Sequence, residues 1–202
     1  MPLSPSVKIT AQALLLAGLF AGLYVWHFGW QSPYRFELEW DEEVQLHDSR
    51  LMQVHIKRSY ESRSLFSRRD AVRLETDISF NAGPPLGLFR QRFAPDDVAL
   101  IDQLNQVWYI ATTPSAMAVG RKPDPSSPPF WTFGPGQPVQ QAGAADKLPA
   151  AFTRWNVMPD TAGPEGLAPF HQTLLKLDDK MRHWAAHPRP NGEDTIRLRP
   201  RS

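Results

Sequence analysis

Two histidine groups are the first candidates for chemistry, because imidazole serves both as a general base and as a metal ligand. His183 and His187 are four residues apart and Asp179 precedes them by one turn, so one helix face could present all three. A metalloprotease helix has glutamate directly after its first histidine, whereas this chain has Trp184 and offers no evident third ligand. The spacing therefore indicates a solvated helix end, and no metal site is predicted.

The second group is His47-Asp48 together with His55. These residues could form an acid–base pair or a metal-binding pair across a hairpin. The polarity of a hairpin turn explains the same residues, and we favour that interpretation. Ser115 lacks the Gly-x-Ser-x-Gly sequence of a nucleophile elbow. Cysteine is absent, which excludes thiolate chemistry and disulfides. No catalytic residue and no cofactor are predicted, and a non-catalytic protein is expected.

Charged residues are segregated along the chain, although Lys and Arg number 22 against 21 for Asp and Glu. Residues 37–48 contain six acids and no base. Residues 57–73 contain six bases, namely Lys57, Arg58, Arg63, Arg68, Arg69 and Arg73. The basic stretch could bind an anion, a lipid headgroup or a partner. The alternative, which we favour, is that acidic and basic strands pair across a sheet. Aromatic residues are not interleaved with the bases, so no nucleic-acid partner is predicted.

The elements that would position these residues are mainly strands. Apolar and polar residues alternate through residues 34–40, 52–56 and 72–80, and shorter strands are expected at 86–93, 98–101 and 107–111. This pattern predicts an antiparallel sheet domain built as a meander, a sandwich or an open barrel. The apolar phase of the strands predicts one buried cluster of Phe36, Leu38, Trp40, Val54, Leu74, Ile78, Phe80, Val107 and Tyr109.

Prolines mark the C-terminal half, where seven fall within residues 114–138. Phe130, Trp131 and Phe133 predict a short strand inside this extended crossing. Leu148, Phe152 and Trp155 predict a further stretch of buried chain. Apolar residues then recur at steps of three and four and predict one amphipathic helix. Its apolar face would comprise Leu167, Phe170, Leu174, Leu177, Met181 and Trp184.

The N-terminal segment 9–30 carries no formal charge and is long enough to cross a hydrocarbon core of roughly 30 Å as a helix. Bulky aromatic residues gather at its C-terminal end, as they do at membrane interfaces, where a signal-peptidase site would need small residues. An uncleaved membrane anchor is therefore predicted. Lys8 precedes the segment and only Arg35 follows it closely, which predicts a cytoplasmic N-terminus. Gly18 and Gly22 form a GxxxG sequence that could support a homodimer.

The run from Trp40 to Leu51, together with residues 82–85 and 104–109, resembles a loose group of uncharacterised proteobacterial envelope proteins. Members of that group share an EEV-LHDGR opening and a short β-rich domain. The resemblance covers roughly residues 40–113 and implies an envelope setting without an assigned activity. Ser49 stands where the group has glycine, which predicts a turn without positive φ.

The sequence thus predicts a bacterial inner-membrane protein with a periplasmic domain. The expected parts are a cytoplasmic tail (1–8), a transmembrane helix (9–30), a β-rich domain (31–158), a linker and amphipathic helix (159–187) and a mobile tail (188–202). Its expected role is binding another envelope protein, as an accessory subunit of an assembly or as an immunity-like protein. A membrane-tethered envelope hydrolase and a module for anionic headgroups, using Lys57 to Arg73, remain the alternatives.

Overall fold

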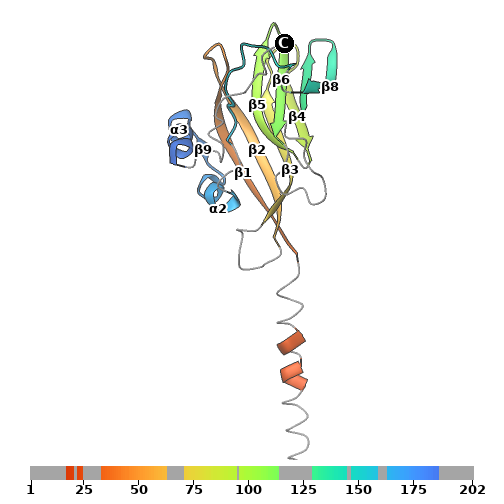
Figure 1. The fold of residues 1–202 in the computed structure, drawn as a ribbon, viewed down its shortest axis with the longest axis vertical. Helices are drawn as coiled ribbons and strands as arrows, with labels where there is room; N and C mark the ends of the chain where they lie inside the picture. The colour runs from red at the N-terminus through yellow and green to blue at the C-terminus, as the bar shows by residue number, and fades with distance from the viewer. Residues whose placement is uncertain are drawn as a thin grey trace, which may run out of the picture.

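The computed structural model describes residues 17–20, 22–24, 33–62, 71–94, 96–113, 129–144, 147–158 and 163–186. Its described part is mainly β, with two sheets and few helices, as the sequence predicts (Figure 1). Several predicted features lie outside these residues, including tails 1–8 and 188–202, most of segment 9–30, Ser115 and His187.

The larger sheet has five strands in the order β4-β3-β2-β1-β9. The first four form an antiparallel meander, and β9 lies parallel to β1 at the edge. Their bounds are β1 Tyr34–Gln45, β2 Leu51–Ser62, β3 Val72–Asn81, β4 Leu88–Phe93 and β9 Leu174–Leu175. The alternation of apolar and polar residues places each of the four long strands close to its predicted position.

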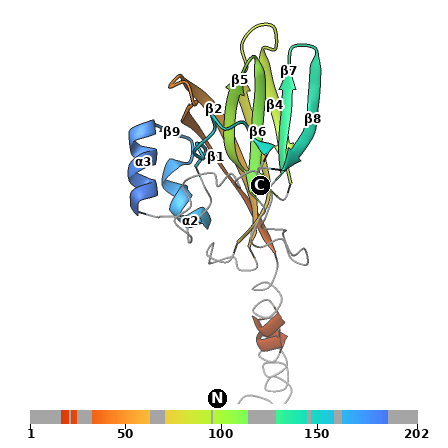
Figure 2. The same ribbon diagram turned by 45° about the horizontal axis from the view of Figure 1, so that its top comes forward.

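The smaller sheet is an antiparallel meander in the order β5-β6-β7-β8. Its strands are β5 Asp97–Leu104, β6 Val107–Thr113, β7 Pro129–Gly134 and β8 Gln137–Ala144. The sequence did not predict β8, because Gln137–Ala144 contains few apolar residues, and its described side chains are mostly exposed. Figure 2 shows β8 beside β7 at the edge of the smaller sheet. The two separate sheets share one core cluster, which gives a sandwich-like arrangement.

Two hairpin turns use left-handed backbone without glycine. Asn105 and Gln106, at the turn between β5 and β6, both have positive φ (51° and 65°), as a type I′ turn requires. Ser49, between β1 and β2, has φ of 70°. The expectation that Ser49 avoids positive φ is therefore wrong: the serine adopts the conformation that glycine would adopt more easily.

Most of the predicted core is confirmed, but three residues are not in it. Phe36, Leu38, Trp40, Val54, Ile78 and Phe80 share the cluster between the sheets. A bulge opposite Ser59 and Tyr60 shifts the register of β3, so Arg73 faces inward and Leu74 is only half-buried. In β6 the residues that face this core are Trp108 and Ile110, which alternate with the predicted Val107 and Tyr109. Tyr109 packs instead against a second cluster.

The second cluster covers the other side of the smaller sheet. It contains Leu100 and Phe130 from the sheet and Leu148, Phe152 and Trp155 from the segment that follows β8. The predicted burial of that segment is confirmed. Because β5 is covered on both sides, its residues from Asp97 to Asp102 are all buried.

The C-terminal part is not the single amphipathic helix that the apolar spacing predicts. It consists of α2 Gly163–Leu167, the 3₁₀ turn η3 Ala168–Phe170, β9 and α3 Leu177–Ala186. Between the helices the chain follows the edge of β1: the amide of Gln172 donates to Glu39, and Asp41 donates to Thr173. These bonds satisfy edge groups of β1 that a continuous helix would leave unpaired. Figures 1 and 2 show α2, β9 and α3 on the side of β1 that faces away from the smaller sheet.

Near the N-terminus, residues 17–20 and 22–24 are helical, beyond the end of the domain at which β1 begins. Their large apolar side chains are exposed, with exposed fractions of 61% for Leu19, 68% for Phe20 and 55% for Leu23. Added Cβ atoms at Gly18 and Gly22 would meet nothing within 4 Å. Among the described residues, no helix combines the length and the apolar character needed to cross a membrane.

Candidate functional site

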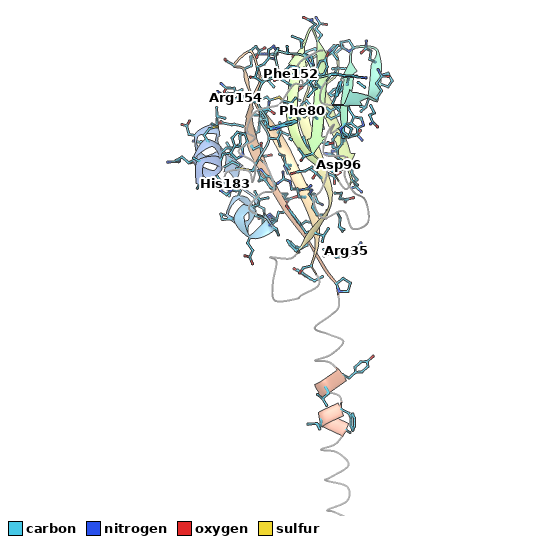
Figure 3. The ribbon with its side chains drawn as sticks, viewed as in Figure 1. Arg35, Phe80, Asp96, Phe152, Arg154 and His183 are labelled. Atoms are coloured by element: carbon cyan, nitrogen blue, oxygen red, sulfur yellow. The ribbon has the colours of Figure 1, made fainter. Side chains whose placement is uncertain are left out.

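A pocket of about 300 Å³ lies where the β1–β2 turn, strand β5, segment 151–156 and helix α3 meet. The turn contributes His47 and Ser49, and β5 contributes Asp102. Figure 3 places Phe152 and Arg154, which also line it, at the end of the domain opposite to Arg35. The pocket is therefore at the far end of the domain from the first residues of β1. Its volume is at the lower end of the range typical of small-molecule sites.

One wall of the pocket is an imidazole–carboxylate pair. Nδ1 of His47 is 2.8 Å from Oδ1 of Asp102, and the backbone amide of His47 donates to Oδ2 at 2.9 Å. The amide of Gln103 also donates to Oδ1 at 2.7 Å. Asp102 is almost fully buried, with an exposed fraction of 2%, whereas the His47 side chain is 21% exposed.

These bonds determine which nitrogen of His47 is available. The Asp102 carboxylate accepts hydrogen bonds from two backbone N–H groups and has no proton of its own to donate. Its contact with the His47 ring is therefore a hydrogen bond in which Nδ1–H donates to Asp102. Nε2 is then the nitrogen that can accept a proton or bind a ligand. The edge contact between the His47 and Phe152 rings, whose centroids are 5.3 Å apart, also fixes the ring orientation.

The remaining walls are aromatic, with one exposed cation. Phe152 and Trp155 are buried at the pocket, and Trp184 reaches it from α3. The indole Nε1–H of Trp184 is buried and has no hydrogen-bond partner in the described part of the chain. Arg154 is exposed, and no ion pair or hydrogen bond of its side chain occurs within the described residues.

Helix α3 is fixed beside the pocket by a buried ion pair, which we call the α3 charge pair. Nζ of Lys180 lies 3.2 Å from Oε1 of Glu42, and both side chains are essentially inaccessible. Lys180 also donates to the backbone oxygens of Glu43 and Asn156. Glu42 in turn accepts from the indole of Trp40 and from the amide of Met158. Every donor of the ammonium is therefore used.

A second group of buried charges, the inter-sheet charge cluster, joins the two sheets. Asp97 of β5 accepts from Arg58 of β2 at 3.0 Å and pairs with Arg73 of β3 at 3.2 Å. The hydroxyl of Thr76 donates to the same carboxylate. The guanidinium of Arg58 also donates to the carbonyl of Met158 and lies 5.0 Å from the centre of the Trp40 ring.

The predicted basic patch does not form one exposed surface. Arg58 and Arg73 are buried in the inter-sheet charge cluster, so their inclusion in an exposed patch is wrong. Lys57 lies on the outer face and pairs with Glu37 at 2.8 Å, a hydrogen bond that raises the pKa of the Lys57 ammonium. The other three bases, Arg63, Arg68 and Arg69, lie outside the described residues. Of the described bases, Lys57 pairs across neighbouring strands, whereas Arg58 and Arg73 pair with Asp97 of the other sheet.

His47 and His55 do not form an acid–base or metal pair with each other across the hairpin, and Asp48 bonds within the turn, as the favoured interpretation expects. His47 pairs with Asp102, while Asp48 pairs with Arg50 and His55 pairs with Asp41. Hydrogen bonds from the Arg50 backbone and side chain lower the pKa of Asp48. His183 on α3 meets the ring of Phe170 edge-on. Within the described residues, no three His, Asp or Glu side chains are grouped in a way that could hold a metal ion.

Asp102 and Arg154 are two pocket residues that the sequence alone did not single out. Asp102 lies 55 positions from His47, and only the packing of β5 beside the β1–β2 turn brings them together. Glu42 and Arg58 left a detectable signal: each occupies an inward position in an otherwise apolar phase of its strand.

Comparisons of this chain with protein-family models, with curated proteins and with solved structures give no match. The function is therefore inferred from the residues and their geometry.

Proposed function

We propose that this chain is a membrane-anchored binding protein of the bacterial envelope. Its N-terminal segment 9–30 would anchor it in the inner membrane, and its β domain would face the periplasm. The domain would bind another envelope protein, as an accessory subunit or an immunity-like protein, without catalysing a reaction. No nucleic acid and no cofactor is part of the proposal.

The observation that carries the proposal is the opposite placement of two surfaces. Leu19, Phe20 and Leu23 are exposed on helical residues beyond one end of the domain, where water would be an unfavourable surrounding. A hydrocarbon core would bury these side chains and would satisfy the helix backbone internally. The pocket lies at the other end of the domain, where a partner could approach without obstruction by the bilayer.

Membrane attachment is tested by extracting membranes of cells that express the full chain with alkaline carbonate. We expect the chain to stay in the pellet with its N-terminus intact. A soluble species that begins after residue 24 would instead establish a cleaved signal peptide.

Orientation is tested separately by fusion after Ser202: alkaline phosphatase should be active and green fluorescent protein should be dark. The opposite pattern would place the domain in the cytoplasm.

A membrane-tethered hydrolase is the second candidate, and the His47–Asp102 pair favours it. A buried carboxylate that orients a histidine with a free Nε2 is the arrangement that general-base catalysis uses. The substitution His47→Gln would remove the base while keeping a polar side chain in the pocket. If the hydrolase is correct, this variant should lose the cellular phenotype at normal abundance, and the binding role predicts that the phenotype is retained.

A further inference from the structure

The exposed cation of the pocket is unengaged within the described chain, whereas the buried carboxylate and the buried ammonium that line it are already bonded. Its carboxylate, Asp102, already accepts three hydrogen bonds, and its ammonium, Lys180, already donates three. Arg154 remains unengaged within the described chain. An exposed guanidinium beside aromatic walls offers a ligand a charge-assisted hydrogen bond together with apolar contacts.

From this we infer that the pocket binds a carboxylate carried on an apolar body. Arg154 would pair with the carboxylate, because a guanidinium matches the two carboxylate oxygens. Phe152 and Trp155 would contact the apolar body.

A single negative charge fits this site better than a phosphate group does. Among the lining residues, all of which are described, Arg154 is the full cation that lacks an ion-pair partner, since Lys180 is paired with Glu42. One cation balances one carboxylate, whereas a phosphate of about two negative charges would leave charge uncompensated in a partly aromatic pocket. The inference rests on the binding role proposed above and is independent of membrane attachment.

The test uses the full chain in a mild non-ionic detergent and a matched pair of probes, 3-phenylpropionate and its neutral amide. Binding is followed by the indole N–H signals in ¹H–¹⁵N NMR spectra. We expect the acid to bind at least about tenfold more tightly than the amide, because a charge-assisted hydrogen bond is lost in the amide. Equal affinities, or no saturation by either probe, would overturn the inference.

The variant Arg154→Gln should remove the preference for the acid. Arg154 is exposed, so this change should not alter the melting temperature. Arg90→Gln is the matched control, because Arg90 is also exposed but lies on β4, far from the pocket in the fold. If Arg154→Gln kept the preference, or if Arg90→Gln removed it, the assignment of the carboxylate to Arg154 would be wrong.

The source of the carboxylate is distinguished by a second pair of probes, an acetylated tripeptide ending in phenylalanine with a free or an amidated C-terminus. Tighter binding of the free-acid peptide than of phenylpropionate identifies a protein C-terminus as the ligand. Exclusion of the peptide, with phenylpropionate still bound, identifies a small free acid. A chain that washes from membranes but still prefers the acid would refute the anchor and leave this inference standing.

Discussion

Asp97 and Glu42 are both buried carboxylates paired with buried cations, but they connect different parts of the domain. Asp97 belongs to the inter-sheet charge cluster, in which all four side chains come from strands of the two sheets. Glu42 belongs to the α3 charge pair, whose cation comes from a C-terminal helix. The cluster therefore spans the core, whereas the pair attaches a peripheral element to it.

The two groups meet at one short stretch of backbone. Met158 accepts a hydrogen bond from Arg58 through its carbonyl and donates one to Glu42 through its amide. Asn156 accepts from Lys180, and its side-chain amide bonds the carbonyls of Gln45 and Ile101. Segment 156–158 consequently supplies backbone partners to both groups.

This difference separates global stability from local attachment. Damage to the inter-sheet charge cluster should destabilise both sheets, because they share one core. Damage to the α3 charge pair should release α3 and alter the pocket, while the sheets keep their own hydrogen bonds and apolar contacts. The cost of a broken buried pair comes largely from the charge that remains buried.

The largest effect is expected for Asp97→Ala, which removes the carboxylate shared by Arg58 and Arg73. Removing one partner from a buried pair costs about 3–5 kcal/mol, and two buried guanidinium groups place this change at the upper end. Against a typical domain stability of about 5–15 kcal/mol, this loss is about a third or more of the free energy of unfolding. Urea unfolding of the full chain in detergent, followed by tryptophan fluorescence, measures the effect.

Asp77→Ala is the control for that experiment, because Asp77 forms only a partly exposed pair with Arg92. We expect its midpoint to stay close to that of the wild type. A midpoint for Asp97→Ala as high as that of Asp77→Ala would show that the inter-sheet charge cluster does not stabilise the packing of the sheets.

A smaller and more local effect is expected for Lys180→Met. Glu42 would keep its bonds from Trp40 and Met158, so the loss should be near the lower end of the range, about 3 kcal/mol. Limited proteolysis should cleave α3 faster than in the wild type, while the sheets stay resistant. Lys176→Met is the control, because Lys176 is exposed just before α3. Equal protection of α3 in both variants would contradict the attachment role.

The pairing itself is measured by a double-mutant cycle of Glu42→Gln and Lys180→Met. The double variant no longer buries an unpaired charge, so it should lose less free energy of unfolding than the sum of the two single losses. We expect a coupling energy of at least about 1 kcal/mol, as contacting residues commonly show. Additive losses would mean that Glu42 and Lys180 stabilise the domain independently.

The sequence predicts the parts of the fold that depend on local alternation. Strands β1, β2 and β3 follow a period of two, and most of their apolar phase is buried as expected. The bulge that turns Arg73 inward depends on pairing with β2, and no local pattern reveals it. Helix α3 also differs from its local pattern. Lys180 is buried, whereas Met181, which the spacing placed on the apolar face, is exposed.

The pocket was harder to predict, because its residues come from four separate parts of the chain. His47 was identified as a candidate, but its partner on β5 depends on how the two sheets pack. Glu42 could have been identified, since a charge in the middle of an apolar phase requires a buried partner. The identity of that partner, 138 positions away, required the tertiary structure.

The smallest effect is expected for Lys57→Gln, which breaks an ion pair on the outer face of β1 and β2. Lys57 and Glu37 are in contact at 2.8 Å, but their side chains are 33% and 56% exposed. Water and salt weaken such a pair, so the loss should stay below about 1 kcal/mol and shrink at high ionic strength. Because the hydrogen bond that Lys57 donates to Glu37 raises the pKa of Lys57 in the folded chain, this contribution is fully present below the ordinary lysine pKa near 10.5. It is lost as the pH rises through the higher folded value. Urea unfolding of wild type and variant at about pH 8 and at a pH above the folded pKa of Lys57 should therefore show a small difference that is lost at the higher pH. A loss as large as that of Lys180→Met would mean that burial does not separate the strong pairs of this domain from the weak ones.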